Sequence, residues 1–317
     1  AGIRTAFEKL AVKKRPLILF IQGHGEVRLT DSSPLGYSFL RDYLLNEAYQ
    51  VKEDFIESSY FSQANLIILS YPKRDLSPSE LTQMEDYLKK NNAIFMIDPE
   101  EARTYPNLRS LLAAQGAGLG DDVILDRTSR TFGADDLIPV VTDLSQHEIV
   151  RGLGAPLFFP LARSVRMLGG AEKHKWESDY LLFSGKESWG ETDYVSLEKG
   201  NYSFEEGEDQ KGPLALGLAM ERKAKEAQNR LLLFGDSDFV NNTNIQAGGN
   251  RILFLNSISW VLREKIGSDS FGLRTDSKPC VIPPAQNTRL FFTLVAAPTL
   301  ISFLTFGGMF FLRQFFT

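Results

Sequence analysis

Four short apolar runs recur along the first 265 residues, and stretches with helical periodicity separate them. A run that is apolar at every position is typical of a strand buried on both faces, as in a parallel sheet. The alternation of such strands with helices predicts an α/β fold with a mostly parallel sheet and flanking helices. Residues 50–56 fit an additional edge strand. The four runs lie at residues 16–22, 64–71, 93–97 and 230–234.

The predicted helices carry their own sequence signals. Ser77-Pro78-Ser79-Glu80 has the form of a capping box with proline at the first helical position. Residues 35–47, 107–115 and 250–263 are also predicted to be helical. The first of these is expected to bury one face made of Leu35, Phe39, Leu40, Tyr43 and Leu44. The last is expected to bury a face made of Ile252, Leu255, Ile258, Ser259 and Leu262.

The domain organisation follows from shifts in composition. Residues 1–15 are polar and are predicted to be a linker, and residues 16–265 are predicted to form the α/β domain. Within that domain, residues 130–215 hold short apolar pieces among many Gly, Ser and charged residues. We therefore expect a β-rich extension in that part. Several Gly and Pro residues mark residues 266–288 as a second linker.

The end of the sequence is strongly apolar. Leu290–Leu312 carries no charge, and as a helix it would be about 34 Å long, enough for a hydrocarbon core of about 30 Å. Arg289 and Arg313 stand at its two ends, so a transmembrane helix is predicted at residues 289–313. The alternative is a buried core helix, but core helices seldom stay apolar on every face for this length. We therefore expect a lipid bilayer to hold the chain.

Charge and cysteine content exclude several function classes. The chain has 35 Lys and Arg and 40 Asp and Glu, a net charge of −5. Nucleic-acid binding needs a basic surface, so no nucleic-acid partner is expected. The single cysteine, Cys280, excludes an internal disulfide and a zinc site built from cysteines.

Candidate ligand-binding residues follow the first buried strand. In Gly23-His24-Gly25-Glu26 the two glycines allow a tight turn and a close approach of backbone N–H groups to a ligand. His24 and Glu26 add an ionisable pair. Ligands of open α/β sheets bind outside the C-terminal ends of the strands, where this loop is expected to lie. The segment is neither a dinucleotide-binding fingerprint nor a P-loop. The alternative is a solvated turn without a ligand.

Two further candidates follow the strand at residues 230–234. Asp236 and Asp238 lie two residues apart and suit a divalent cation or the hydroxyl groups of a sugar. They equally suit a turn, because Asp side chains accept hydrogen bonds from nearby backbone N–H groups. Asp98-Pro99-Glu100-Glu101 also ends a strand and is predicted to begin a helix, where acidic residues favour the dipole. We predict ligand binding by Asp236 and Asp238, without a resident metal.

No signal for covalent catalysis accompanies these motifs. An activated Ser or Cys needs a base within reach, but Cys280 lies in the predicted linker and no G-x-S-x-G motif occurs. Ser70 ends a strand, yet Tyr71-Pro72 follows, and proline is a poor start for the helix after a nucleophile. His147 and His174 lie in the irregular part. We therefore predict a protein that is not an enzyme, with no catalytic residues and no cofactor.

Several segments within about residues 16–312 are weak signals individually, but the order in which they follow one another is characteristic of a protein family. They are ILFIQGHGE (18–26), LIILSYPKRDLSPSELTQMEDYL (66–88), AIFMIDP (93–99), LSQHEIVRGL (144–153), LLFSGKESWGETD (181–193), RLLLFGDSDFVNN (230–242), GNRILFLNSISWVL (249–262) and the terminal apolar segment. With these segments the chain resembles the GldG-like family of ABC-transporter auxiliary proteins, which includes gliding-motility components.

The resemblance implies a fold like that of class I glutamine amidotransferases, with a flavodoxin-like sheet, on the extracytoplasmic side of the bacterial inner membrane. It implies an ABC permease and its ATPase as partners, and a sugar-like ligand bound without catalysis. The expected function is a binding or scaffolding subunit of an ABC-type transport system, of the gliding-motility type. One alternative is a structural component of a cell-envelope machine. Another is a membrane-tethered hydrolase that holds a metal with His24, Glu26, Asp98, Asp236 and Asp238.

Overall fold

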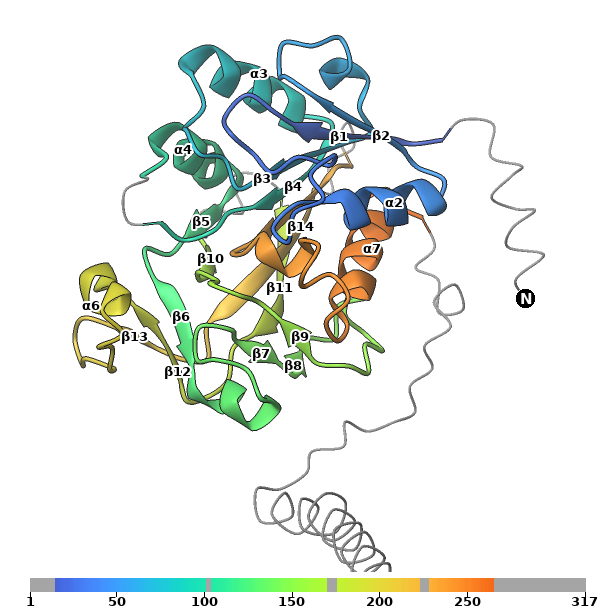
Figure 1. Ribbon diagram of the computed structural model, residues 1–317. Coiled ribbons are helices and arrows are strands. Elements are labelled where there is room, and N and C mark those ends of the chain that lie inside the picture. Colours follow the sequence, from blue (N-terminus) through green and yellow to red (C-terminus); the bar gives the residue numbers. More distant parts are fainter. Residues whose placement is uncertain (1–14, 101–103, 170–175, 223–227, 265–317) are drawn as a thin grey trace, which may run out of the picture. The chain divides into compact units, whose positions relative to one another are not determined.

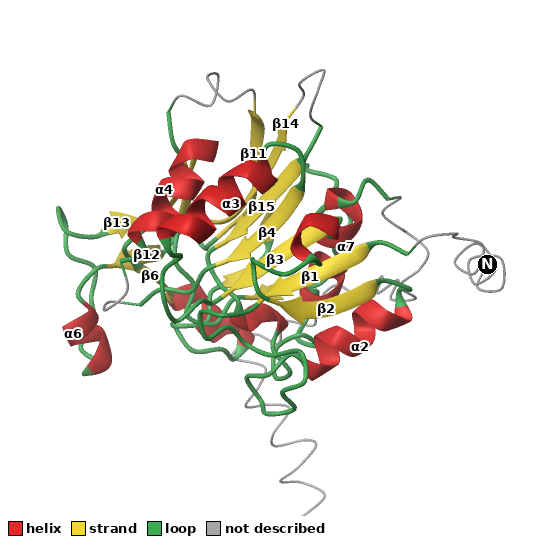
Figure 2. Ribbon diagram, turned by 90° about the horizontal axis from the view of Figure 1, so that it is seen from above, coloured by secondary structure: helices red, strands yellow, loops and turns green. Residues whose placement is uncertain are grey.

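The computed structural model describes residues 15–100, 104–169, 176–222 and 228–264. An eight-stranded sheet runs through this part, in the order β2-β1-β3-β4-β15-β14-β11-β8 (Figures 1 and 2). Its strands are β1 (Leu17–Ile21), β2 (Gln50–Asp54), β3 (Leu66–Ser70), β4 (Asn92–Met96), β8 (Asp143–Leu144), β11 (Trp176–Phe183), β14 (Ala215–Arg222) and β15 (Arg230–Phe234). The strands expected from the four apolar runs, and the edge strand, are all confirmed.

The central sheet is mixed, whereas a mostly parallel sheet was expected. The first five strands in the order, β2 to β15, pair in parallel, and β14, β11 and β8 continue the sheet in antiparallel fashion. The connection between β14 and β15 explains the change of direction. A parallel connection needs a crossover of a dozen or more residues, and only the residues between Arg222 and Arg230 are available.

The parallel strands define the edge of the sheet at which open α/β folds usually bind ligands. Their order, β2-β1-β3-β4-β15, is the order of flavodoxin-like sheets, in which the chain reverses its direction of winding between β1 and β3. The helices that follow β1 and β3 therefore lie on opposite faces of the sheet. This switch point is the usual place for a ligand in open α/β sheets.

Two hydrophobic cores lie on the two faces of the sheet. On β1, Ile18 and Phe20 belong to one core, and Leu19 and Ile21 belong to the other, because successive side chains of a strand point to opposite faces. Helices α2 (Ser38–Asn46) and α7 (Asn250–Val261) cover the first face, and α3 (Pro78–Leu88) and α4 (Pro106–Gln115) cover the second. The result is a three-layer α/β arrangement.

The helix signals of the sequence are confirmed at α3 and α4. Ser77 Oγ accepts a hydrogen bond from the backbone N–H of Glu80 (3.3 Å), and the Glu80 carboxylate accepts one from the backbone N–H of Ser77 (2.7 Å). This pair is the predicted capping box. Helix α4 ends at Gly116, whose φ of +89° lies in the left-handed region that favours glycine.

The expected buried faces of α2 and α7 are partly wrong. Leu35 precedes α2, and Leu35 and Phe39 are 62% and 44% exposed, while Leu40 and Leu44 are buried. Helix α7 buries residues on nearly all sides, because it lies between the sheet and the irregular part of the chain. Consequently Ile252, which was expected to face the core, is only half-buried. The buried residues of α7 are Asn250, Leu253, Phe254, Leu255, Asn256, Ser257, Ile258, Trp260 and Val261.

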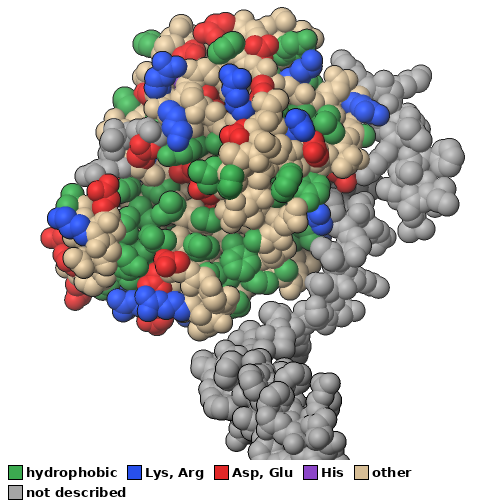
Figure 3. Space-filling view, viewed as in Figure 1, with side chains coloured by type: hydrophobic (Ala, Val, Ile, Leu, Met, Phe, Trp, Pro, Cys, Tyr) green, Lys and Arg blue, Asp and Glu red, His purple; other side chains and the backbone are tan. Residues whose placement is uncertain are grey.

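The predicted β-rich part, residues 130–215, is confirmed as rich in short strands. Some of these strands join the central sheet, and others form small sheets of their own. Hydrophobic side chains gather on the face of this part that Figure 3 shows. The described residues form these further elements: β5 (Ala117–Leu119), β6 (Val123–Asp126), β7 (Val140–Val141), β9 (Leu157–Phe158), β10 (Val165–Met167), β12 (Ser188–Glu191), β13 (Gln210–Lys211), α6 (Tyr194–Glu198) and the 3₁₀ turns Phe61–Gln63, Arg127–Phe132 and Asp238–Val240.

The predicted membrane segment, Leu290–Leu312, and the predicted linker at residues 266–288 lie outside the described residues, as do Cys280 and His174. In the part of the chain that the structure describes, no helix has the length and apolar character needed to cross a membrane.

Candidate functional site

The loop of the first candidate motif lies at the switch point of the sheet. Its backbone is bonded to the loop that follows β3: the N–H of Lys73 donates to the carbonyl of His24 (2.6 Å), and the guanidinium of Arg74 donates to the carbonyl of Gly23 (2.6 Å). Gly23 and Gly25 have φ angles of +122° and +88°. These positive φ angles confirm the predicted tight turn and favour glycine at both positions. A Cβ atom on Gly25 would also come within 2.8 Å of the Lys73 side chain.

His24 lies between two carboxylates. Its Nδ1 is 2.8 Å from Glu26 Oε1, its Nε2 is 3.0 Å from Glu80 Oε1, and its backbone N–H donates to Glu26 Oε2 (2.8 Å). Burial alone lowers the pKa of His24, but the hydrogen bonds and negative charges of Glu26 and Glu80 outweigh it, so that the pKa is raised. The arrangement favours an imidazolium that ties the β1 loop to the start of α3.

Glu80 is a member of this cluster that the sequence analysis did not find. Burial raises the pKa of Glu80, but hydrogen bonds from Ser77 and the interaction with His24 have the larger combined effect, so its pKa is lowered. In the sequence, Glu80 has a complete explanation as the third residue of a capping box. Its second contact crosses to a loop 56 residues earlier in the chain, and no local pattern predicts such a contact.

A second cluster joins the ends of β4 and β15. Carboxylate oxygens of Asp98, Asp236 and Asp238 lie within 4.8 Å of one another. Asp236 accepts hydrogen bonds from the backbone N–H groups of Asp238 (2.7 Å) and Phe239 (3.1 Å), which is the predicted turn role. Asp98 accepts from the hydroxyl (2.8 Å) and the backbone N–H of Ser237. The cluster therefore combines turn residues with a carboxyl group from the neighbouring strand.

Burial and mutual repulsion disfavour ionisation of this cluster. Burial and the charge of Asp238 raise the pKa of Asp98 to about 8, although Ser237 and Lys73 act in the opposite direction. The pKa of Asp236 is also raised well above its usual value, first by burial and then by the charges of Asp98 and Asp238. Burial raises the pKa of Asp238 too. At neutral pH the cluster therefore retains protons, and it has the oxygen donors that a cation could use instead.

The prediction that Asp98 begins a helix is wrong. Helix α4 starts only at Pro106, and Asp98 is buried beside Ser237 in the neighbouring loop. The physical reason is that β4 and β15 are adjacent parallel strands, so their C-terminal ends lie side by side. The contact that determines the role of Asp98 is tertiary.

The five residues of the metal-dependent alternative do not form one cluster. Within the described residues, His24 bonds to Glu26 and to Glu80, and none of the side-chain hydrogen bonds of His24 and Glu26 reaches an aspartate of the second cluster. Lys73 interacts with both clusters. Its backbone bonds to His24, and its positive charge partly opposes the rise in the pKa of Asp98 and Asp238. A metal ion at this edge of the sheet would have the carboxylates of Asp98, Asp236 and Asp238 as ligands, without His24 and Glu26.

Ser70 and Ser237 lie at or just after the ends of strands, and their hydroxyl groups bond to Tyr37 and Asp98 and not to a histidine that could act as a base. The hydroxyl groups of Ser70 and Tyr37 share a hydrogen bond of 2.6 Å, and the Tyr37 hydroxyl donates to the carbonyl of Ser237 (3.0 Å). Tyr71 follows β3 with a φ of +46°, and its hydroxyl donates to Glu100 (3.0 Å). His147 lies elsewhere, with its ring 5.0 Å from that of Trp260. These contacts stabilise the loops, and the hydrogen bonds of the two serine hydroxyl groups go to Tyr37 and Asp98 rather than to an imidazole.

Arg163 is a further residue that the sequence analysis missed. It is fully buried, and its guanidinium donates to the carbonyl groups of Gly120 (2.7 Å) and Asp98 (3.1 Å). It thereby ties the β4 loop to the segment that leads into β10. Burial lowers its pKa. A single arginine in an irregular segment carries no sequence signal for this role.

Comparison with known proteins gives a family. The profile of a family described as an ABC-type uncharacterized transport system matches residues 15–257. The chain belongs to this family of ABC-type transport auxiliary proteins. The matched residues include the central sheet, both side-chain clusters and most of α7. The sequence features that define the family therefore lie in the domain that the structure describes. A search of the curated proteins found no match.

One solved structure has a fold similar to that of this auxiliary protein. The mmIFT52 N-terminal domain superposes with a TM-score of 0.59 at 14% identity, over 77% of this chain and 97% of that domain. At that identity the likeness concerns the fold alone. A GH42 β-galactosidase from Rahnella sp. R3 matches with a TM-score of 0.43 at 10% identity, over 83% of this chain, and the matched part is 34% of the enzyme.

Proposed function

We propose that this auxiliary protein is a non-catalytic binding or scaffolding subunit that associates with the permease and ATPase of an ABC-type transport system. The observation that carries the proposal is the family match over residues 15–257. Its α/β domain lies outside the cytoplasm of a bacterial cell, and the apolar segment 290–312 anchors it in the inner membrane. The resemblance to GldG-like proteins extends the proposal to complexes of the gliding-motility type.

We place the ligand-binding function of this subunit at the Gly23–Glu26 loop. The loop occupies the switch point of the sheet, where ligands of open α/β folds bind. His24, Glu26 and Glu80 offer imidazole and carboxylate groups there, a set suited to the hydroxyl groups of a sugar-like ligand. The hydrogen bonds of Ser70 and Ser237 to other groups support a role without covalent catalysis.

Purification in a mild detergent tests the partnership. The full chain is expected to bring down a permease and an ATPase in stoichiometric amounts, identified by mass spectrometry. Recovery of the chain alone, under conditions that keep other membrane complexes intact, would contradict the proposal. A chain without residues 289–317 serves as a control for the predicted anchor.

Substitution at the loop separates ligand binding from scaffolding. The Glu26→Gln variant is expected to retain the partners and to lose transport, because it removes a carboxylate from the buried cluster without changing the size of the side chain. Glu57→Gln, at an exposed position outside the loop, is the matched control and should transport normally. Normal transport by Glu26→Gln would leave scaffolding as the function.

The metal-dependent hydrolase is the second candidate, and the cluster of Asp98, Asp236 and Asp238 favours it. It predicts a stoichiometric divalent ion in protein purified without chelator, and loss of that ion in Asp236→Ala. The Asp143→Ala variant, which changes an exposed aspartate, controls for charge. A protein that contains no ion and takes up none on dialysis against Mg²⁺, Mn²⁺ or Ca²⁺ would eliminate this candidate.

A further inference from the structure

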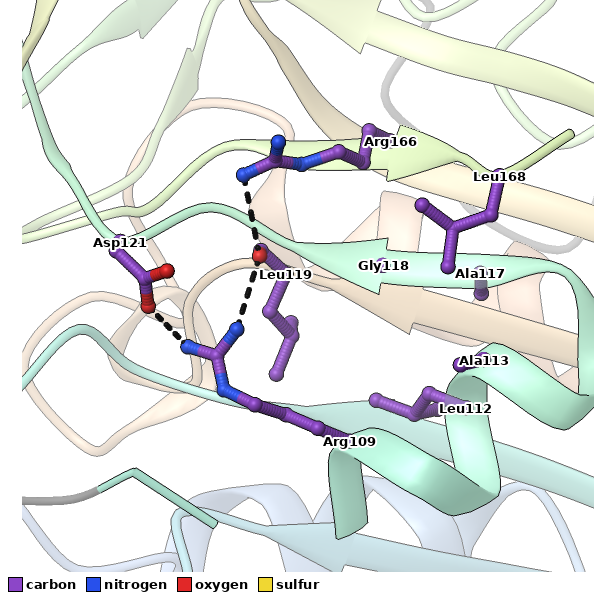
Figure 4. A pocket seen from close by; sticks show the side chains of 9 residues that line it. All are labelled: Arg109, Leu112, Ala113, Ala117, Gly118, Leu119, Asp121, Arg166 and Leu168. Carbon is purple, nitrogen blue, oxygen red and sulfur yellow. Dashed lines mark hydrogen bonds and ion pairs between the residues drawn. The ribbon is translucent and has the colours of Figure 1, made fainter. Parts of the chain in front are cut away.

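A pocket of about 270 Å³ lies between α4, β5 and β10 (Figure 4). None of the ligand-binding candidates at the strand ends lines it. One wall is apolar and consists mainly of Leu112 and Ala113 from α4, Ala117 from β5, and Leu168 after β10. The other end carries Arg109, Arg166 and Asp121. The pocket is therefore apolar along one side and charged at one end.

The charged end brings two guanidinium groups to one oxygen atom. The carbonyl of Leu119 accepts hydrogen bonds from Arg109 Nη1 (3.2 Å) and from Arg166 Nη2 (3.3 Å), as the dashed lines in Figure 4 show. Arg109 also forms an ion pair with Asp121. Among the described residues no carboxylate pairs with Arg166. The positively charged side chains of Arg109 and Arg166 thus share one uncharged acceptor, the carbonyl of Leu119.

The surrounding charges leave an excess of positive charge. The buried guanidinium of Arg163 is 3.5 Å from Asp121, so that this carboxylate faces two arginines while its own side chain is 75% exposed. The nearby Asp122 carboxylate is occupied by the N–H and hydroxyl of Ser164 (2.8 and 2.7 Å). Among these described residues, the charged end of the pocket therefore has three guanidinium groups and two carboxylates. The guanidinium groups belong to Arg109, Arg163 and Arg166, and the carboxylates to Asp121 and Asp122.

We propose that this pocket binds a small organic carboxylate with a short apolar chain. The carboxylate lies against Arg109 and Arg166, whose planar guanidinium groups match its geometry, and the chain lies along Leu112, Ala113 and Leu168. Pockets for drug-sized ligands measure about 300–1,000 Å³, so a volume of about 270 Å³ suits a chain of a few carbon atoms. The source is a free short-chain acid or the C-terminal residue of a polypeptide.

Calorimetric titration of the full chain in detergent tests the ligand class. Hexanoate is the probe, hexanamide is its neutral counterpart, and N-acetyl-L-leucine represents a polypeptide C-terminus. Hexanoate or N-acetyl-L-leucine is expected to bind at least tenfold more tightly than hexanamide. The tighter of the two carboxylates identifies the source. Equal binding of hexanoate and hexanamide, or no binding of either carboxylate at millimolar concentration, would overturn the proposal.

Variants of the two ends of the pocket locate the binding. Arg166→Ala removes an exposed side chain, and Ala113→Phe fills the apolar side from an exposed position of α4. Each is expected to weaken carboxylate binding at least tenfold. The controls Arg151→Ala and Ser110→Phe change exposed residues outside the pocket and should bind as the unchanged protein does. Unchanged binding in both pocket variants, with thermal unfolding confirming that they are folded, would refute the site.

The Asp121→Asn variant gives a result of the opposite sign. The Asp121 carboxylate competes with a ligand carboxylate for Arg109, so its neutralisation is expected to strengthen hexanoate binding several-fold. A general loss of structure would weaken binding instead. Weaker binding by a folded Asp121→Asn protein would contradict the assigned position of the carboxylate. Because the readout is ligand binding by the isolated chain, this result does not depend on the proposed transport partners.

Discussion

The carboxyl group of Asp98 has a hydrogen-bond partner 139 positions away in the chain. Ser237 supplies two hydrogen bonds to its carboxyl group, while burial and the charge of Asp238 raise its pKa to about 8. Next to Pro99 and Glu100 in the sequence, the same residue has the pattern of a helix start. Local pattern and tertiary environment thus assign different roles, and the environment decides the protonation state.

The raised pKa of Asp98 predicts how stability changes with pH. An unfolded Asp releases its proton near pH 3.8, whereas the folded protein holds this one to about pH 8. Between these values the folded state binds more protons than the unfolded state, so stability falls as pH rises. Asp98→Asn cannot titrate and keeps groups that can bond to Ser237, so this part of the decline should disappear.

Urea unfolding at several pH values between 4 and 9, with a chelator present, measures this effect. The free energy of unfolding of Asp98→Asn, relative to the unchanged protein, is expected to increase over the range and to level off above about pH 8, the pKa of Asp98 in the folded protein. Asp143→Asn, at an exposed site, should show no such trend. A constant difference between Asp98→Asn and the unchanged protein would contradict the assignment.

At the scale of elements, the strands and the capped helix are evident from sequence, but the orientation of α7 is not. Phe254 of α7 is fully buried, with its ring 6.0 Å from that of Phe239. Asn256 is also buried, and its side chain donates to the carbonyl of Ile149 (2.9 Å). A helix enclosed on several sides has no single apolar face, so helical periodicity cannot identify its contacts.

Two substitutions in α7 distinguish the observed orientation from the expected one. Phe254→Ala is expected to lower the free energy of unfolding by about 3–5 kcal/mol, because it leaves a cavity in the core. Ile252 is only half-buried, so Ile252→Ala should cost distinctly less. Denaturant unfolding of both variants provides the measurement. A larger decrease in the free energy of unfolding for Ile252→Ala than for Phe254→Ala would support the helix orientation predicted from the periodicity and contradict the observed one.

At the scale of the whole molecule, the family match and the predicted anchor concern different parts of the chain. The match covers residues 15–257, and the apolar segment 290–312 follows it. The side of the membrane on which the domain lies is part of the proposed function. The single cysteine makes this testable, because Cys280 precedes the segment by only ten residues.

Labelling of Cys280 with a maleimide that cannot cross membranes tests the orientation. In cells with a permeabilised outer membrane and an intact inner membrane, we expect the full chain to be labelled. Cys280→Ser gives the background. Labelling that requires disruption of the inner membrane would place the domain in the cytoplasm and contradict the proposal.

The sequence by itself determined the features that depend on neighbours along the chain. These are the strands with an apolar residue at every position, the capping box at Ser77, and the glycines at 23 and 25 with positive φ. Each expresses the conformational preference of a few adjacent residues. The order of motifs also indicated the family, because it extends over most of the chain.

Only the tertiary structure decided which of these features meet. The antiparallel half of the sheet, the contact of Glu80 with His24, the cluster around Asp98 and the arginines of the α4 pocket all join segments distant in sequence. Strand order and helix packing produce these contacts. They arise from burial and hydrogen bonding over the whole domain, which no local pattern of polar and apolar residues records.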